Sequence, residues 1–111
     1  MFGFSRKPAH RVVSPAELQS LLRAGTATVV DVREPNEFAV GHIPRAQNLP
    51  LSRFDPTALP VGGGKTLILS CAAGKRSGMA LDRCAAAKSD VDTHLAGGFG
   101  AWTSVGLPVE K

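Results

Sequence analysis

The stretch that most constrains the fold of this chain runs from residue 66 to residue 80. It opens with the uncharged, mostly apolar run 66–69, passes through Cys71 and a small-residue segment, and ends in a helical pattern. A short apolar run bounded by Gly and Ser predicts a buried strand. The pattern after it predicts a helix capped by Ser77, with four apolar positions at helical spacing: Met79, Ala80, Leu81 and Cys84. We therefore expect a strand, a tight loop headed by a thiol, and a helix N-terminus.

This loop is predicted to activate Cys71. The backbone N–H groups of residues 72–77 can turn toward one point, where the positive end of the helix dipole also favours an anion. A thiolate is such an anion, so we expect a lowered pKa for Cys71 and a nucleophile at neutral pH. A free cysteine is more often a small buried hydrophobe, but the surroundings of Cys71 favour function. The residues expected to bind an anionic substrate are Ala72, Ala73, Gly74, Lys75, Arg76 and Ser77.

The rest of the chain alternates between short strands and helices. Strands are predicted at residues 11–13, 28–32, 46–49 and 93–95, and helices at residues 15–24, 34–40 and 98–105. Such alternation indicates an α/β domain with a parallel sheet. The carboxyl ends of parallel strands meet at one edge, so Asp31 and Arg33 should lie beside Cys71. We favour a structural role for both, with Arg33 paired to Glu37 and Asp31 bonded to loop N–H groups.

Composition narrows the class of protein. The 111 residues are enough for one core, and we expect a loose tail at residues 1–10 and a single domain at residues 11–111. The net charge of +4 is scattered and aromatic residues are few, unlike a nucleic-acid-binding surface. No stretch has the length and apolar character of a signal peptide or a membrane span. We therefore expect a cytoplasmic protein with no nucleic-acid partner and no membrane segment.

The histidines and cysteines do not predict a metal site or a cofactor. His10, His42 and His94 are isolated from one another and from the cysteines along the sequence. Cys71 and Cys84 are poorly placed for a disulfide, because a loop and part of a helix separate them. We expect His42 to pack or to form hydrogen bonds, and Cys84 to pack inside its helix.

Four motifs together resemble those of rhodanese-type sulfurtransferases. They are the loop at residues 71–77, two parts of an N-terminal signature at residues 30–38 and 41–46, and a C-terminal signature at residues 97–102 and 106–109. The motifs span most of the chain in the family's order and spacing. Arg45 departs from the family, which usually carries glycine there, so we expect a differently shaped turn at this position.

The resemblance implies a fold and a reaction. The fold is a rhodanese-like three-layer domain with a central five-stranded, mainly parallel sheet flanked by helices. In the reaction, the Cys71 thiolate attacks the outer sulfur of an anionic donor such as thiosulfate and releases sulfite. The resulting persulfide passes its sulfur to cyanide, a thiol or a protein acceptor. Residues 72–77 bind the donor, Asp31 and Arg33 support the loop, and no cofactor is implied.

Two other functions compete with this interpretation. Some rhodanese-like domains are non-catalytic or regulatory protein-interaction modules, but these typically lack the cysteine or have a damaged loop. Cysteine-dependent phosphatases and arsenate reductases of this fold need five residues between the cysteine and an arginine. Here four residues separate Cys71 from Arg76, and Ser77 stands where that arginine would be. For Cys84, a role as a second sulfur carrier is the alternative to packing.

Overall fold

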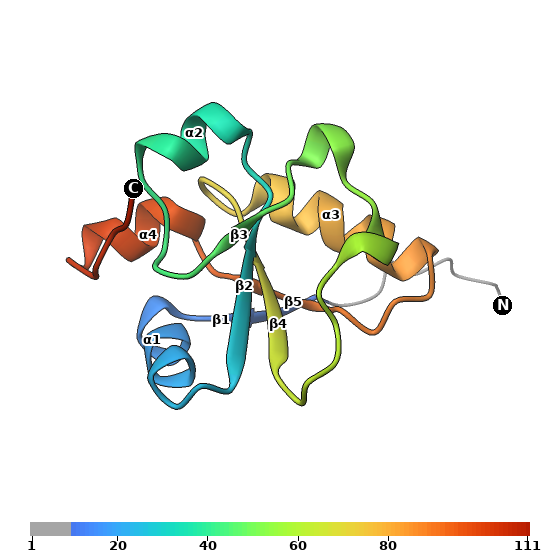
Figure 1. Ribbon diagram of the computed structural model, residues 1–111, viewed down its shortest axis with the longest axis horizontal. Helices are drawn as coiled ribbons and strands as arrows, with labels where there is room; N and C mark the ends of the chain where they lie inside the picture. Colours follow the sequence, from blue (N-terminus) through green and yellow to red (C-terminus); the bar gives the residue numbers. More distant parts are fainter. Residues whose placement is uncertain (1–9) are drawn as a thin grey trace, which may run out of the picture.

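The computed structural model describes residues 10–111, so most of the predicted tail, residues 1–9, lies outside the described residues. The described chain forms one sheet in the order β1-β5-β4-β2-β3, and every neighbouring pair is parallel (Figure 1). This arrangement confirms the predicted five-stranded sheet. The strands are β1 (Arg11–Val13), β2 (Ala27–Asp31), β3 (Gln47–Asn48), β4 (Thr66–Ser70) and β5 (Thr93–Leu95).

Helices cover both faces of the sheet and complete three layers. In Figure 1, α1 (Pro15–Arg23) and α4 (Gly98–Ser104) lie to the left of β2 and β4, and α3 (Lys75–Ala86) lies to their right. The short helix α2 (Pro35–Val40) follows the carboxyl end of β2. Two 3-10 turns, η1 (Leu51–Arg53) and η2 (Pro56–Ala58), lead from β3 toward β4.

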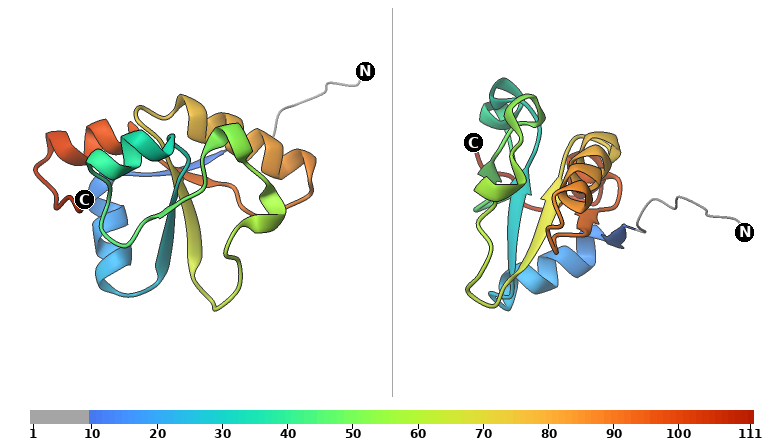
Figure 2. Two further views of the ribbon diagram at one scale, coloured as in Figure 1. Left: turned by 45° about the horizontal axis from the view of Figure 1, so that its top comes forward. Right: turned by 90° about the vertical axis from the view of Figure 1, so that its right-hand side faces the viewer.

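The alternation of side chains along the central strands builds two apolar cores. Val30, Leu67 and Leu69 pack with α3 residues in one core, whereas Val29 and Ile68 pack with α1 and α4 residues in the other. Both faces of these strands are therefore buried, which explains their near-continuous apolar sequence. Because β2 and β4 lie side by side at the centre of the sheet (Figures 1 and 2), their carboxyl ends form a common edge.

The register of the strands fixes which residues meet at this edge. Asp31 of β2 is paired with Ser70 of β4, so Cys71, the residue after Ser70, lies just beyond Asp31 at the edge of the sheet. His94 of β5 is paired with Leu69, two residues before Cys71, on the other side of β4. Three neighbouring strands therefore bring Asp31, Cys71 and His94 to the same end of the sheet.

The turn at Arg45 has an unusual backbone. Its φ is 66°, in the left-handed region that favours glycine. The Arg45 N–H donates to Glu110 Oε1 at 2.9 Å, which ties the turn to the C-terminal segment. The turn thus keeps a conformation that suits glycine although the residue is arginine.

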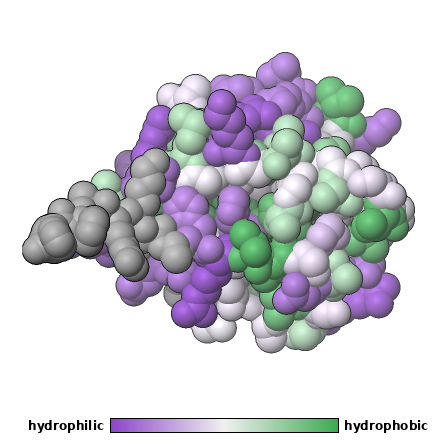
Figure 3. Space-filling model, turned by 180° about the vertical axis from the view of Figure 1, so that it is seen from behind, coloured by the Kyte–Doolittle hydropathy of each residue, from purple (hydrophilic) through white to green (hydrophobic). Residues whose placement is uncertain are grey.

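The surface carries apolar and polar residues side by side. Figure 3 shows apolar surface in the middle and at the right of the rear face, with polar residues around it. Among residues 10–111, no helix combines the length and apolar character needed to cross a bilayer.

Candidate active site

The Cys71 loop is a tight connection between β4 and α3. Cys71 directly follows β4, and α3 begins at Lys75 after the N-cap residue Gly74. Gly74 has a φ of 108°, a conformation that side-chain-bearing residues rarely adopt. The predicted cap at Ser77 is therefore wrong: Ser77 lies inside the first turn, and its side chain is fully buried. Met79, predicted on the apolar face of the helix, is also exposed, whereas Ala80, Leu81 and Cys84 are buried.

Hydrogen-bond donors surround the sulfur of Cys71. The Gly74 N–H donates to Cys71 Sγ at 3.0 Å, and Ser77 Oγ lies 3.5 Å from the same sulfur. Burial raises the pKa of the Cys71 thiol, but hydrogen bonds from the Ser77 hydroxyl and from the N–H groups of Ser77, Gly74 and Ala73 outweigh it. The net pKa lies below the ordinary value of a thiol, which favours the nucleophilic thiolate.

The Ser77 hydroxyl connects this sulfur to the neighbouring strand. Ser77 Oγ lies 2.8 Å from His94 Nδ1 and 3.2 Å from the Gly74 carbonyl oxygen. His94 is therefore close to Cys71 in the folded chain, although the two residues are well separated along the sequence. His10 also lies nearby, since its ring centroid is 5.7 Å from that of His94.

The two cations of the loop differ in their surroundings. Arg76 Nη1 and Nη2 donate to the Glu37 carboxylate at 2.6 and 3.0 Å. These hydrogen bonds lower the pKa of Glu37 to about 2 and raise that of Arg76. Lys75 is exposed and forms no ion pair with any residue from 10 to 111. Its ammonium group is consequently available to an anionic ligand.

Asp31 and Arg33 form a buried ion pair beside the loop. Arg33 Nη2 donates to Asp31 Oδ2 at 2.8 Å and to the Gly41 carbonyl at 2.7 Å. The predicted partner of Arg33, Glu37, is wrong, because Glu37 binds Arg76 instead. Asp31 Oδ1 accepts the backbone N–H of Arg33 at 2.9 Å, which fixes the chain direction after β2.

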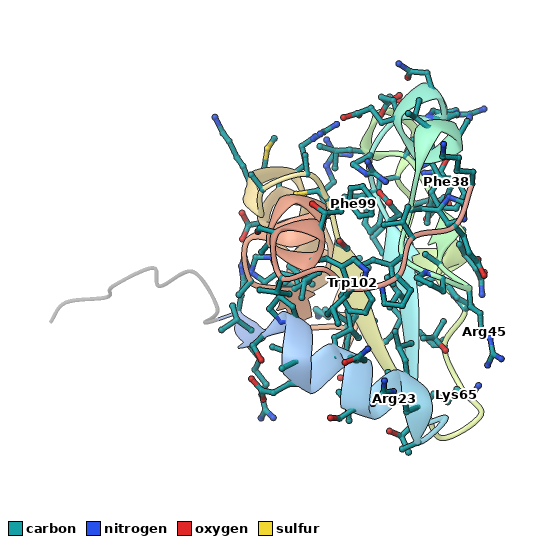
Figure 4. All side chains as sticks on the ribbon, turned by 90° about the vertical axis from the view of Figure 1, so that its left-hand side faces the viewer. Arg23, Phe38, Arg45, Lys65, Phe99 and Trp102 are labelled. Carbon is teal, nitrogen blue, oxygen red and sulfur yellow. The ribbon has the colours of Figure 1, made fainter. Side chains whose placement is uncertain are left out.

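The start of α4 connects this ion pair to the Cys71 loop. The Arg33 guanidinium lies 4.4 Å from the centroid of the Phe99 ring, which projects from α4 toward α2 (Figure 4). The Phe99 N–H donates to the Cys71 carbonyl at 2.7 Å. An added Cβ at Gly98 would overlap that same carbonyl oxygen, so only glycine permits this close approach.

Cys84 and His42, two other residues considered in the sequence, both make packing contacts. Cys84 is fully buried in the core beneath α3, and burial raises its pKa. Both cysteines are free. His42 stacks on Phe38 with ring centroids 3.7 Å apart, and its Nδ1 lies 2.8 Å from the Phe38 carbonyl oxygen. These contacts confirm the packing and hydrogen-bonding role predicted for His42.

A groove of about 310 Å³ lies away from this loop, between α1 and the C-terminal segment. Figure 4 shows Trp102 between α4 and α1, with Arg23 and Arg45 farther out. None of residues 71–77 lines this groove. In the described part of the chain, no three His, Cys, Asp or Glu residues are grouped as a metal site would require.

The sequence interpretation missed two polar partners of the loop, Glu37 and His94. Glu37 follows β2 and His94 lies on β5, and both strands flank β4 in the sheet. The order of the strands in the sheet is what brings both residues to the loop, and the spacing of the motifs along the sequence does not reveal that order.

Comparison with known proteins places the chain in a family. The model of the Rhodanese-like domain family matches residues 14–105. The chain belongs to this family. A Synechocystis protein described as uncharacterized, slr1261, is 44% identical over 89% of the chain, which covers 55% of that relative's length. Thiosulfate sulfurtransferase GlpE of Ectopseudomonas mendocina is 33% identical, with 81% of this chain and 82% of the relative covered.

Solved structures agree with the family assignment. The crystal structure of thiosulfate sulfurtransferase from Pseudomonas aeruginosa is similar to this chain, with a TM-score of 0.78 and 28% sequence identity. The similarity covers 96% of this chain and 20% of that protein. The rhodanese-like chain thus has relatives named as sulfurtransferases, among others of undescribed activity.

Proposed function

We propose that this protein is a sulfurtransferase that carries sulfane sulfur on Cys71. In the first half-reaction, the Cys71 thiolate attacks the outer sulfur of thiosulfate, the sulfur–sulfur bond of the donor breaks, and sulfite leaves with the electron pair. In the second, cyanide or a thiolate attacks the terminal sulfur of the persulfide and regenerates the Cys71 thiolate. The reaction is covalent catalysis in two steps.

The observation that carries this proposal is the set of donors around Cys71 Sγ. The Gly74 N–H at 3.0 Å and the Ser77 hydroxyl at 3.5 Å can hold a thiolate before the reaction and a persulfide anion after it. The rhodanese-like family and the thiosulfate sulfurtransferase relative support the same chemistry.

The loop also fits a small anionic donor. Ala72, Ala73 and Gly74 present little side-chain bulk around the sulfur, and the exposed ammonium of Lys75 supplies positive charge. Arg76 contributes charge that Glu37 largely neutralises, so its main effect is to hold the start of α3 against α2. Asp31 and Arg33 support the loop through Phe99. We place the reaction in the cytoplasm, since a reducing compartment keeps Cys71 free.

Steady-state kinetics test this function. Thiocyanate formation from thiosulfate and cyanide is measured while both concentrations vary, for the wild type and for Cys71→Ser. The proposal predicts parallel double-reciprocal lines, as in a ping-pong reaction, and no turnover in the variant. Hydrolysis of an aryl phosphate without thiocyanate formation would instead favour a phosphatase. Absence of both reactions would favour an interaction module.

A further inference from the structure

A chain of three side chains links Cys71 to a histidine. Cys71 Sγ lies 3.5 Å from Ser77 Oγ, and Ser77 Oγ lies 2.8 Å from His94 Nδ1. The middle member is fully buried, so bulk water does not replace either contact. The carboxyl end of β4, the first turn of α3 and the strand β5 each contribute one residue.

We propose that His94 is a positioning residue that exchanges a proton with Cys71 through the Ser77 hydroxyl and thereby stabilises the thiolate. This inference rests on the proposed role of the Cys71 thiolate. It extends that role by assigning the group that receives the thiol proton.

The proton transfer balances without any other reactant. In the thiol state, Cys71 Sγ–H donates to Ser77 Oγ, and the Ser77 hydroxyl donates to His94 Nδ1. As the S–H bond breaks, its proton bonds to Ser77 Oγ while the Ser77 proton bonds to Nδ1. The products are a thiolate, an intact serine hydroxyl and an imidazolium, and the Ser77 hydroxyl now donates to the sulfur.

The surroundings of His94 make its protonation depend on Cys71. Burial, and then the neighbouring His10, lower the pKa of His94 and disfavour an isolated imidazolium, so the protonated ring needs a thiolate at Cys71 to stabilise it. His10 contacts the His94 ring edge-on, and its own Nε2 lies 3.0 Å from Asp82 Oδ1 of α3. Among residues 10–111, the titratable groups around His94 are thus His10, with Asp82 behind it, and Cys71 through Ser77.

Loss of His94 would redirect the Ser77 hydroxyl. The Gly74 carbonyl oxygen, 3.2 Å from Ser77 Oγ, is the remaining acceptor. A hydroxyl held by that carbonyl donates less often to the sulfur, so the thiolate loses a hydrogen bond and its imidazolium partner.

The pH dependence of Cys71 alkylation by iodoacetamide tests the proposal. Addition is followed by intact mass in the wild type, His94→Asn and the control His42→Asn, with Cys71→Ser as the blank. His94→Asn should react about fivefold more slowly at pH 7, and its rate should rise at higher pH than in the wild type. His42→Asn, which removes a histidine that packs on Phe38, should match the wild type. Equal profiles for all three proteins would overturn the proposal.

A reciprocal measurement does not depend on the fold of the His94 variant. The imidazole resonances of His94 are titrated by NMR in the wild type and in Cys71→Ser. Because coupling between two sites is mutual, removal of the thiolate should move the His94 midpoint to lower pH. An unchanged midpoint would contradict the relay. Coupled titrations in a protein that forms no thiocyanate would refute the sulfurtransferase function and leave the relay intact.

Discussion

Cys71 and Cys84 lie in the same apolar core, yet their thiols are in opposite electrostatic situations. Both are almost completely buried, with exposed fractions of 1% and 0%. Burial raises the pKa of both thiols, but only that of Cys71 falls below the ordinary value. Cys71 precedes a helix whose first N–H groups have no partner within the helix and can donate to the sulfur, whereas Cys84 lies within that helix, where backbone N–H groups are already paired. The supply of hydrogen-bond donors, rather than burial, accounts for the opposite pKa shifts of the two thiols.

Replacement of each cysteine should give the largest contrast. Cys71→Ser should lower thiocyanate formation by at least about a thousandfold, because the nucleophile is gone. Cys84→Ala should keep kcat/KM within about twofold and lower the free energy of unfolding by about 1 kcal/mol through a small cavity. Steady-state kinetics and urea unfolding measure the two effects. A comparable loss of turnover in Cys84→Ala would assign Cys84 a role in sulfur transfer.

Two glycine variants test whether α4 holds the reactive loop. Gly98→Ala forces the Cys71 carbonyl away, so we expect about 2 kcal/mol of destabilisation and at least about a tenfold loss of kcat/KM. Gly106→Ala is the matched control, because its φ of 76° is similar but its surroundings are open. Gly106→Ala should lower the free energy of unfolding by about 1 kcal/mol and leave kcat unchanged. Equal activity of the two variants would show that the loop does not depend on this contact.

The exposed ammonium of Lys75 should affect donor binding more than chemistry. Lys75→Ala should raise the KM for thiosulfate about fivefold, as expected for loss of one unit charge near a partly solvated anion, and leave kcat unchanged. Lys65→Ala removes an exposed lysine just before β4, at the opposite end of that strand. An equal rise in KM for both variants would indicate only a general effect of net charge.

Arg76 should act mainly through its ion pair with Glu37. Arg76→Ala leaves the Glu37 carboxylate unneutralised near the loop, so the KM for thiosulfate should rise about threefold. The double variant with Glu37→Gln should recover most of that loss, because no unpaired charge remains. A double variant as impaired as Arg76→Ala would show that Arg76 binds the donor directly.

The pH dependence of stability should give the smallest contrast. Because the pKa of Cys71 is lowered on folding, the unfolded state binds more protons just below the ordinary thiol value of 9.0. The free energy of unfolding should therefore rise with pH in that window and stop rising in Cys71→Ser. The raised pKa of Cys84 should lower stability above that value, and Cys84→Ala should remove this decline. Urea unfolding between pH 6 and about 10 measures both slopes.

The fold and the centre of the site were readable from the sequence because their signals are local. The apolar run of β4, the capping box at Ser14 and Glu17, and the small residues after Cys71 each act within a few positions. Helix α3 starts earlier than predicted because Gly74 takes the cap position in a left-handed conformation. Ser77 resembles a cap in the sequence, but the fold uses its hydroxyl between Cys71 and His94.

The remaining partners depend on distant segments that meet only in the folded chain. Arg33 and Glu37 have helical spacing, which favours an ion pair between them, but the Arg33 guanidinium instead pairs with the Asp31 carboxylate. Glu37 then meets Arg76, 39 residues away. Such choices follow from strand order and burial, so neighbouring residues in the sequence do not determine them.

The most direct test of the contrast between the two cysteines is mass analysis after incubation with thiosulfate. Intact mass shows whether sulfur is added, and peptide mapping shows which cysteine carries it. We predict a gain of one sulfur atom on the Cys71 peptide, reversed by cyanide and absent in Cys71→Ser. Sulfur on Cys84, or no gain in the wild type, would contradict the account.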